Sequence, residues 1–228
     1  SPQGGVISPL LMNIYLDEFD QKMKSLGIRI VRYADDILIF APTKRKAEQY
    51  QKIATGILES LKLTVNPEKT HICNVSQGVK YLGFMIRTNY VSIDKERIKR
   101  FKDKIRSLTP RNSGVPLAKM IERLTPILRG WGQYFRVANC ASLFSDLMEW
   151  IRRRLRMKKM REWKSWKAFH KQLRRNGFKG ECPKLSMTRW RNSACFHMSF
   201  ALPNRWFTEM KLFDLTNIKT GVLFNYLE

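Results

Sequence analysis

Two adjacent aspartates, Asp35 and Asp36, join two short runs of apolar, β-branched residues. Runs of this length and composition are typical of strands, so residues 28–33 and 37–41 are predicted to form a β-hairpin with both carboxylates at its tip. Adjacent carboxylates repel each other, and an ordinary tight turn uses Asn-Gly or Asp-Gly instead. A solvated turn is the plainest interpretation of the pair taken alone, whereas a bound divalent cation would remove the repulsion.

Carboxylate oxygens are hard ligands that suit Mg²⁺. Two such ions held about 3.5–4 Å apart can activate an attacking 3′-hydroxyl and stabilise a departing pyrophosphate. Neighbouring side chains of a strand face opposite ways, so both aspartates can serve one site only if the turn re-aims them. Asp35 and Asp36 are therefore the candidate catalytic and metal-binding residues, with Mg²⁺ in a two-metal site as the expected cofactor.

Lys and Arg number 43 against 19 Asp and Glu, which gives a net charge of +24 at pH 7. The excess is uneven, because residues 1–91 carry 12 basic and 8 acidic side chains, whereas residues 92–228 carry 31 and 11. An excess of this size attracts a polyanion, and nucleic acid is the first partner to consider. The alternative is a solvated basic surface, although the excess is larger than solubility needs.

The sequence carries no sign of a membrane span or of secretion. Its apolar stretches fall short of the roughly 18 residues of a membrane helix, and no signal-peptide pattern opens the chain. The four cysteines are scattered, without the spacing of a zinc site or a disulfide framework. We expect a protein of the cytoplasm, nucleoid-associated in a bacterium, or of an organelle, and not a secreted one, with no membrane partner.

The periodicity of the apolar residues changes near residue 93. Helical spacing predicts helices over residues 7–23, 44–61, 94–108, 117–131 and 143–155, with Asp94 placed to cap the third of them. Three further strands are predicted over residues 70–75, 79–84 and 90–93. At 228 residues and 43% hydrophobic content the chain can bury a core. The pattern favours an α+β fold whose second part is all-α.

The order of four short motifs carries a family resemblance. Residues 1–5 read Ser-Pro-Gln-Gly-Gly, residues 33–36 Tyr-Ala-Asp-Asp, residues 66–70 Asn-Pro-Glu-Lys-Thr and residues 81–84 Tyr-Leu-Gly-Phe. In this order they resemble the palm domain of reverse transcriptases, whose hallmark is the Tyr-x-Asp-Asp hairpin. The resemblance implies a partial palm, made of an antiparallel sheet plus helices, and RNA-directed DNA polymerase activity.

The resemblance also implies roles at the matching positions. Asp35 would be the main metal ligand and Asp36 its active-site companion. The nucleotide would meet Gln3, Gly4, Ala34 and Lys69. The primer grip would comprise Tyr81, Leu82 and Gly83, with Tyr33 beside the primer terminus.

A second run makes the resemblance more specific. Residues 124–135, Leu-Thr-Pro-Ile-Leu-Arg-Gly-Trp-Gly-Gln-Tyr-Phe, look like the maturase or X domain of group II intron-encoded proteins, which serves as the polymerase thumb. The implied domains are a palm over 1–93, a helical maturase thumb over 94–165 and a small basic DNA-binding-like region over 166–228. The implied partners are group II intron RNA, template RNA, a DNA primer, dNTP substrates, target DNA and, as a homodimer, a second copy of the chain.

Polymerases of this family take a third aspartate from a palm strand before the Pro-Gln-Gly motif. This chain begins at that motif, so we expect it to be the C-terminal part of a longer protein, lacking the fingers and catalytically incomplete alone. The alternative is a non-enzymatic RNA-binding splicing factor, although a maturase without polymerase activity has no need of Asp35 and Asp36. A general basic nucleic-acid-binding fragment ranks below both.

The densest basic run covers residues 152–161, Arg-Arg-Arg-Leu-Arg-Met-Lys-Lys-Met-Arg. Leu155 is expected to stay on the apolar face of a helix while the other side chains point outward to phosphates. The candidate RNA- and DNA-binding residues are Arg129, Arg136, Arg152, Arg153, Arg154, Arg156, Lys158 and Lys159. Trp163, Trp166 and Phe169 could stack on unpaired bases, but their helical spacing favours a place in the thumb core.

Overall fold

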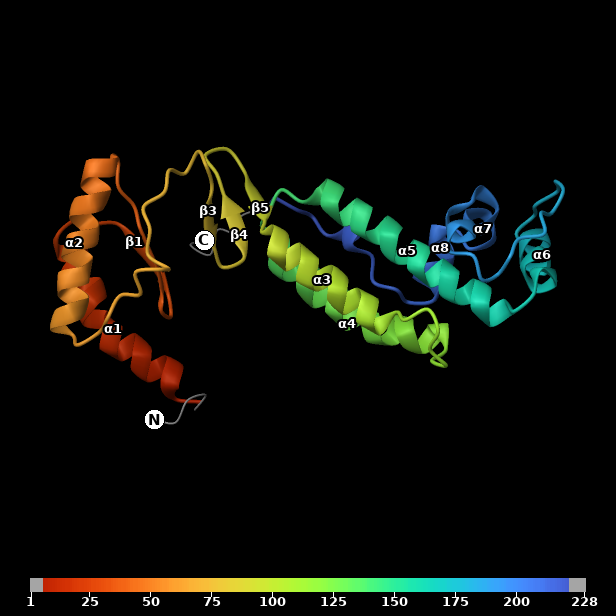
Figure 1. Ribbon diagram of the computed structural model, residues 1–228, viewed down its shortest axis with the longest axis horizontal. Coiled ribbons are helices and arrows are strands. Elements are labelled where there is room, and N and C mark those ends of the chain that lie inside the picture. The colour runs from red at the N-terminus through yellow and green to blue at the C-terminus, as the bar shows by residue number, and fades with distance from the viewer. Residues whose placement is uncertain (1–5, 222–228) are drawn as a thin grey trace. The chain divides into compact units, whose positions relative to one another are not determined.

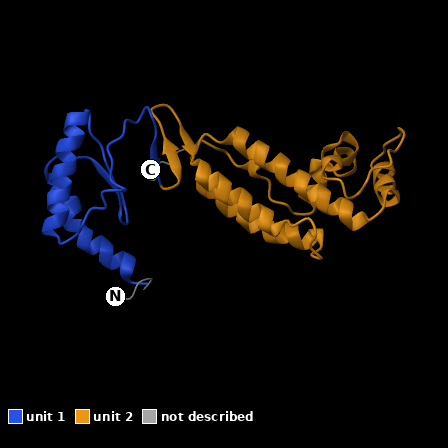
Figure 2. Ribbon diagram, in the orientation of Figure 1, with its two compact units in different colours: residues 1–81 blue, residues 82–228 orange. Residues whose placement is uncertain are grey.

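The computed structural model describes residues 6–221, and the chain divides into two compact units, Ser1–Tyr81 and Leu82–Glu228 (Figure 2). We call them unit 1 and unit 2. Helices and small antiparallel sheets make up both, which confirms the predicted α+β class. Within the described residues, no helix is both long and apolar enough to cross a membrane.

Unit 1 packs two helices with a β-hairpin (Figure 1). Its elements are α1 (Ser8–Ser25), β1 (Ile30–Tyr33), β2 (Asp36–Ile39), α2 (Lys44–Ser60) and β3 (Val79–Tyr81). The hairpin strands are antiparallel, in a register that runs from Ile30 opposite Ile39 to Tyr33 opposite Asp36. The predicted hairpin is therefore present, although its first strand begins two residues later than expected and its second spans residues 36–39 rather than 37–41.

Alternation along the two hairpin strands decides which face is buried. Ile30, Ile37 and Ile39 pack against a small core, whose buried residues are Leu16, Phe19, Met23, Ile28, Ala54 and Leu61. Val31 and Tyr33, between these positions, lie on the opposite face and are exposed. The hairpin thus has one face on the core and one open face, on which Tyr33 lies opposite Asp36.

Two predicted strands are wrong in detail. Residues 70–75, all of them described, form loop and turn and are exposed, because β-prone residues form a strand only where a partner and a buried face are at hand. The strand predicted over 79–84 is interrupted at Leu82 and Gly83, whose φ angles of 49° and 84° lie in the left-handed region of a turn.

Unit 2 is mostly helical. Its elements are β4 (Phe84–Ile86), β5 (Val91–Ile93), α3 (Lys95–Leu108), α4 (Leu117–Phe135), α5 (Ala141–Trp163), α6 (Trp166–Arg175), η1 (Trp190–Ala194), α7 (Phe196–Ala201), α8 (Asn204–Glu209) and η2 (Leu215–Asn217). α3 starts after Asp94 as predicted, although the Asp94 side chain makes no capping hydrogen bond to the helix. α4 continues through Pro126.

The core of unit 2 lies between α3, α4 and α5, which run side by side (Figure 1). Leu124, Leu128, Phe144, Ile151 and Leu155 are all at most 1% exposed. The segment after α8 returns along α4 and α5 and places η2 against both helices. Because this return segment packs on α4 and α5 in addition to the neighbouring helices, each of the two helices buries residues on more than one side.

The β4–β5 hairpin belongs to unit 2 because it is fastened to the helices. The Phe84 ring stacks on Tyr134 at a centroid distance of 5.6 Å, and Ile93 is part of the helical core. The side-chain oxygen of Asn139 accepts a hydrogen bond of 3.1 Å from the backbone amide of Val91, and the backbone amide of Asn139 donates one of 2.8 Å to the Val91 carbonyl. The two compact units consequently divide after Tyr81, whereas the family resemblance implies a palm that ends at residue 93.

Two glycines in α4 give a matched prediction. A Cβ on Gly132 would lie 2.5 Å from Ile218 Cδ1 and 2.6 Å from Leu215 Cδ2, whereas a Cβ on Gly130 would meet nothing within 4 Å. Gly130→Ala should therefore raise the free energy of unfolding by up to about 1 kcal/mol, because alanine favours a helix. Gly132→Ala should lower it by about 1–2 kcal/mol, because Leu215 is fully buried and has no room to move. Urea unfolding of both variants checks this, and shifts of the same sign would contradict the packing.

Candidate active site and nucleic-acid interface

The turn of the β1–β2 hairpin consists of Ala34 and Asp35, because Tyr33 already pairs with Asp36. The expectation that both aspartates form the tip is thus wrong for Asp36, which is the first residue of β2. Ala34 makes the tight reversal possible by adopting φ 53°, an uncommon conformation for a residue other than glycine. Because Asp35 lies in the turn and only Asp36 lies in a strand, the two side chains need not point to opposite faces of the hairpin. Both residues are exposed.

Arg32 fastens this turn to α1. Its Nε lies 3.0 Å from both carboxylate oxygens of Asp20, and its Nη2 donates to Asp20 Oδ2 at 2.6 Å. Its Nη1 donates to the side chain of Asn13 at 3.0 Å and to the carbonyl of Ala34 at 3.2 Å. The hydrogen bonds to Asp20 raise the pKa of Arg32. The guanidinium therefore links the helix to the backbone of the carboxylate turn.

Arg32→Lys should show how much the guanidinium group of Arg32 contributes to stability. Lysine keeps the charge but cannot reproduce the two-sided contact with Asp20 and the bond to Ala34 together. We expect the free energy of unfolding of unit 1 to fall by about 1–3 kcal/mol. The matched control is Arg29→Lys, at an exposed position just before β1, which should have little effect in the same denaturation experiment. Equal losses in the two variants would contradict the role of Arg32.

Tyr81 is the one primer-grip residue that the structure brings to the hairpin within unit 1. Its hydroxyl donates to the backbone carbonyl of Asp36 at 3.4 Å, and burial, followed by the negative charge of Asp36, raises its pKa. Leu82 and Gly83 belong to unit 2, where their carbonyls accept hydrogen bonds from the Tyr134 hydroxyl at 2.9 Å and the Asp94 amide at 3.0 Å.

The other predicted nucleotide contacts are less informative. Lys69 is exposed in the loop after α2, and its backbone amide bonds to Asn66 at 3.3 Å. Gln3 and Gly4 lie outside the described residues.

Asp35 and Asp36 supply the donor type that Mg²⁺ prefers, on an exposed turn. Over residues 6–221, no group of three or more His, Cys, Asp or Glu side chains gathers as a complete metal site. The two carboxylates therefore fit a divalent cation as part of a ligand set, and the remainder would come from other protein groups, substrate or water.

The basic run of α5 does not point outward as a whole. Arg156 and Lys158 are each only 7% exposed, so the expectation that they face solvent is wrong. Arg156 Nε donates to the Leu202 carbonyl at 3.1 Å, and Lys158 Nζ donates to the Ser113 carbonyl at 2.6 Å. Burial, and next the charge of Arg152, lowers the pKa of Arg156. These two cations hold the surrounding loops to α5.

The remaining candidates of the run are also engaged within unit 2. Arg152 pairs with Asp214, and Lys159 lies 3.1 Å from Glu162. Arg153 lies over the ring of Trp190 at 5.1 Å, and Arg154 bonds to Thr109. Apart from the Lys159–Glu162 pair, which lies within α5, the sequence could not show this, because the partners lie 37 to 62 residues away along the chain.

The two remaining candidates for binding nucleic acid, Arg129 and Arg136, lie on α4 and directly after it. Arg129 is exposed, with its guanidinium 5.3 Å from the ring centre of Phe213. Arg136 is half-buried at the end of α4. The proposed contact of either residue with nucleic acid stays a prediction.

Exposed cations that the sequence reasoning did not single out lie on α3. Its apolar residues Phe101 and Ile105 are buried, and its solvent face carries Lys95, Arg97, Lys99, Arg100, Lys104 and Arg106. The helical period contained this signal, because the cations occupy the positions opposite the buried stripe. α3 therefore presents six exposed cations, together with the exposed carboxylates of Glu96 and Asp103.

The aromatic cluster after α5 belongs to the core. Phe169 is 0% exposed, and its ring lies 6.0 Å from that of Trp163. Trp163 and Trp166 are partly buried against the same core. The preference for a core role over base stacking is confirmed for this cluster.

Comparison with known families agrees with both parts of the fold. Residues 1–86 match the model of the family "Reverse transcriptase (RNA-dependent DNA polymerase)", and residues 98–177 match "Group II intron, maturase-specific domain". The first match ends with β4, and the second begins within α3 and covers α4, α5 and α6.

Two curated proteins of Escherichia coli are similar to this chain. Protein YkfC of strain K12 is 38% identical over 36% of this chain and 31% of its own length. Retron Ec86 reverse transcriptase is 31% identical over 46% of this chain and 34% of its own length. The chain thus spans about a third of the length of these relatives. Residues 1–86 are therefore similar to the reverse transcriptase family and residues 98–177 to the group II intron maturase-specific family, the pairing that the motifs predict.

Proposed function

We propose that this chain forms part of an RNA-directed DNA polymerase and maturase of a group II intron. The observation that carries the proposal is the exposed two-residue turn that presents Asp35 beside Asp36, in a chain that continues into a maturase-specific segment. Its proposed partners are template RNA, a DNA primer, dNTP substrates, intron RNA and target DNA. It would work wherever the intron is transcribed, in a bacterial cytoplasm or an organelle.

In this proposal Asp35 is the main metal ligand and Asp36 its companion. When bound, Mg²⁺ would favour the attacking 3′-hydroxylate and stabilise charge on the departing pyrophosphate. Arg32 holds the turn that carries Asp35, and Tyr81 bonds to the backbone of Asp36, so both residues position the carboxylates. Preorganised ligands of this kind lower the reorganisation that the reaction requires.

A splicing factor without polymerase activity is the second candidate. It is favoured by the absence, among the described side chains, of a group of three or more His, Cys, Asp or Glu that could hold a metal ion. The basic surface of unit 2 would then account for the whole activity through its binding of intron RNA.

Primer extension and RNA binding together separate the two candidates. The chain is assayed alone and with the family's palm segment that carries the third aspartate, on an RNA template with Mg²⁺, beside the double variant Asp35→Asn, Asp36→Asn. The polymerase proposal expects DNA synthesis by the completed protein, none by the variant, and equal binding of intron RNA by both. Failure of the completed protein to make DNA, with intact RNA binding, would favour the splicing factor.

A further inference from the structure

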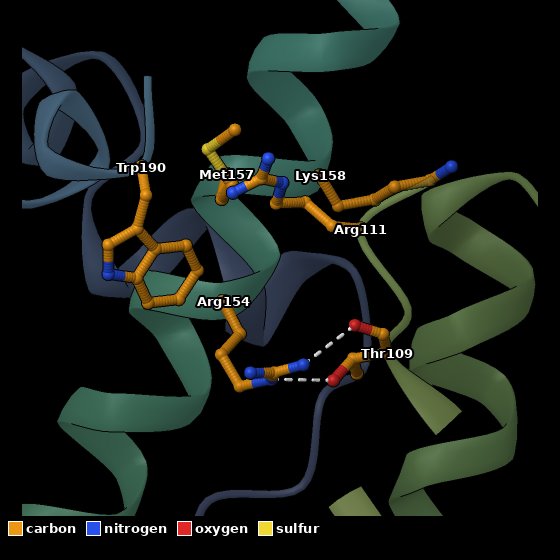
Figure 3. Close-up of a pocket in the computed structure, with 6 residues that line it drawn as sticks. All are labelled: Thr109, Arg111, Arg154, Met157, Lys158 and Trp190. Carbon is orange, nitrogen blue, oxygen red and sulfur yellow. Dashed lines mark hydrogen bonds between the residues drawn. The ribbon is translucent and has the colours of Figure 1, made fainter. Parts of the chain in front are cut away.

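A cavity of about 200 Å³ opens in unit 2 between α5, the loop after α3 and η1 (Figure 3). Its lining residues are Thr109, Arg111, Arg154, Met157, Lys158 and Trp190. Three of the six are cations and none is acidic. The lining also includes the indole of Trp190 and the fully buried Met157, so the cavity combines positive charge with apolar surface.

The cations of this cavity are positioned but not neutralised. Arg154 donates from Nε to Thr109 Oγ1 at 2.7 Å and from Nη2 to the Thr109 carbonyl at 2.9 Å, both neutral acceptors (Figure 3). Arg111 is exposed and makes no ion pair with the described part of the chain. Lys158 points away from Trp190, toward the Ser113 carbonyl. The cavity therefore has a surplus of positive charge that an anion would offset.

The surroundings of Arg154 also carry a surplus of positive charge. Burial, followed by the charge of Arg106, lowers its pKa. Both guanidinium groups lie against the ring of Trp150, at 5.6 Å for Arg106 and 5.3 Å for Arg154. The carboxylate of Asp103 pairs with Arg106 at 2.5 Å, on the side of α3. An anion in the cavity would therefore meet Arg154 without displacing an existing ion pair.

We propose that this cavity binds a single unpaired nucleotide of a nucleic-acid strand. Its phosphate would meet Arg111 and Arg154. Its base would lie against the indole of Trp190 in place of the guanidinium groups of Arg153 and Arg154, which lie over that ring at 5.1 and 5.9 Å. Arginine pairs with phosphate through its planar fork, and aromatic side chains bind unpaired bases by stacking. A duplex would not fit, because its bases are stacked on one another and cannot lie flat against the indole. The inference rests on the proposed function, since it assigns one contact of the nucleic acid that unit 2 is proposed to bind.

The test measures binding of the full chain to a fluorescent oligouridylate of about ten nucleotides and to an RNA duplex, at one fixed salt concentration. Arg111→Gln should weaken binding to the single strand about tenfold or more. The matched control is Arg175→Gln, which removes an exposed arginine from α6 and should have a smaller effect. Trp190→Leu should weaken single-strand binding about tenfold to a hundredfold, with duplex binding nearly unchanged. Because Trp190 contributes to the core, its thermal unfolding is compared with that of the wild type; if it does not fold, Arg111→Gln decides the result.

Losses for Arg111→Gln no larger than for Arg175→Gln, or equal losses for duplex and single strand, would overturn the proposal. A deoxyuridylate strand of equal length shows whether the nucleotide belongs to RNA or DNA. If the variants lose affinity only for the RNA strand, the cavity binds an RNA nucleotide; if they lose affinity equally for both strands, it binds a nucleotide of RNA or DNA. Intron RNA is titrated in parallel. A wild-type chain that does not prefer intron RNA contradicts the maturase function, whereas preserved preference with no effect of Arg111→Gln contradicts only the cavity.

Discussion

Asp35→Asn should reduce primer extension by the completed polymerase at least about a thousandfold. An amide keeps the size of the side chain but loses the charge that holds a divalent cation, and the transition state loses several kcal/mol of stabilisation. Asp35 lies in the turn itself, next to Ala34 with its positive φ angle, and the pairing of Tyr33 with Asp36 fixes the place of this turn. The measurement is the extension rate at saturating dNTP and Mg²⁺.

Two further variants make this result specific. Asp36→Asn, at the first position of β2, should cause a smaller loss if Asp36 is the companion rather than the main ligand. Glu59→Gln removes an exposed carboxylate from α2 and should leave the rate unchanged. A rate for Asp35→Asn close to that of Glu59→Gln would show that the turn is not the catalytic site.

The second large effect concerns the binding of nucleic acid to α3. Changing Lys95, Lys99, Arg100 and Lys104 together to Gln should lower the slope of log affinity against log salt by about 3–4, because each lost phosphate contact removes about 0.9. Between 50 and 200 mM salt, the wild-type affinity should then fall about a hundredfold more than that of the variant. Fluorescence anisotropy at several salt concentrations measures both slopes.

The control for this prediction comes from the basic run of α5. Lys159 pairs with Glu162, so Lys159→Gln should leave the slope nearly unchanged. If Lys159→Gln lowers the slope as much per charge as the α3 variant does, phosphates are bound by the run that the sequence singled out. The structure favours α3, whose cations are exposed.

Local patterns in the sequence were sufficient to predict the hairpin and the helices α1 to α5, but not the shorter helices α6, α7 and α8. Short β-branched runs on either side of Asp35 and Asp36 predict two strands, and α3 begins after Asp94 as expected. The precise position of Asp36 was not predictable, because it depends on Ala34 adopting a left-handed backbone conformation that sequence preferences disfavour.

Features that depend on distant contacts were missed. The burial of Arg156 and Lys158 follows from Leu202 and Ser113, which pack against α5 from other segments of unit 2. The need for glycine at position 132 depends on the return of η2, which no local pattern indicates.

In α1, apolar residues that were expected to be buried are exposed. The helical pattern predicts one continuous apolar face, but the structure buries only its second half. Leu10, Leu11 and Ile14 are exposed, while Phe19 and Met23 are fully buried. Apolar periodicity therefore predicts the helix correctly without showing what covers it.

A metal-specificity switch at Asp35 tests the central claim most directly. Asp35→Cys replaces a hard oxygen ligand with a softer thiolate, which binds Mg²⁺ poorly and later first-row metals such as Mn²⁺ better. We expect the completed polymerase with Asp35→Cys to extend a primer very slowly in Mg²⁺ and to recover part of its rate in Mn²⁺, with no recovery for Asp35→Asn. Full activity of Asp35→Cys in Mg²⁺, or equal losses in both metals, would contradict the assignment of this carboxylate as a metal ligand.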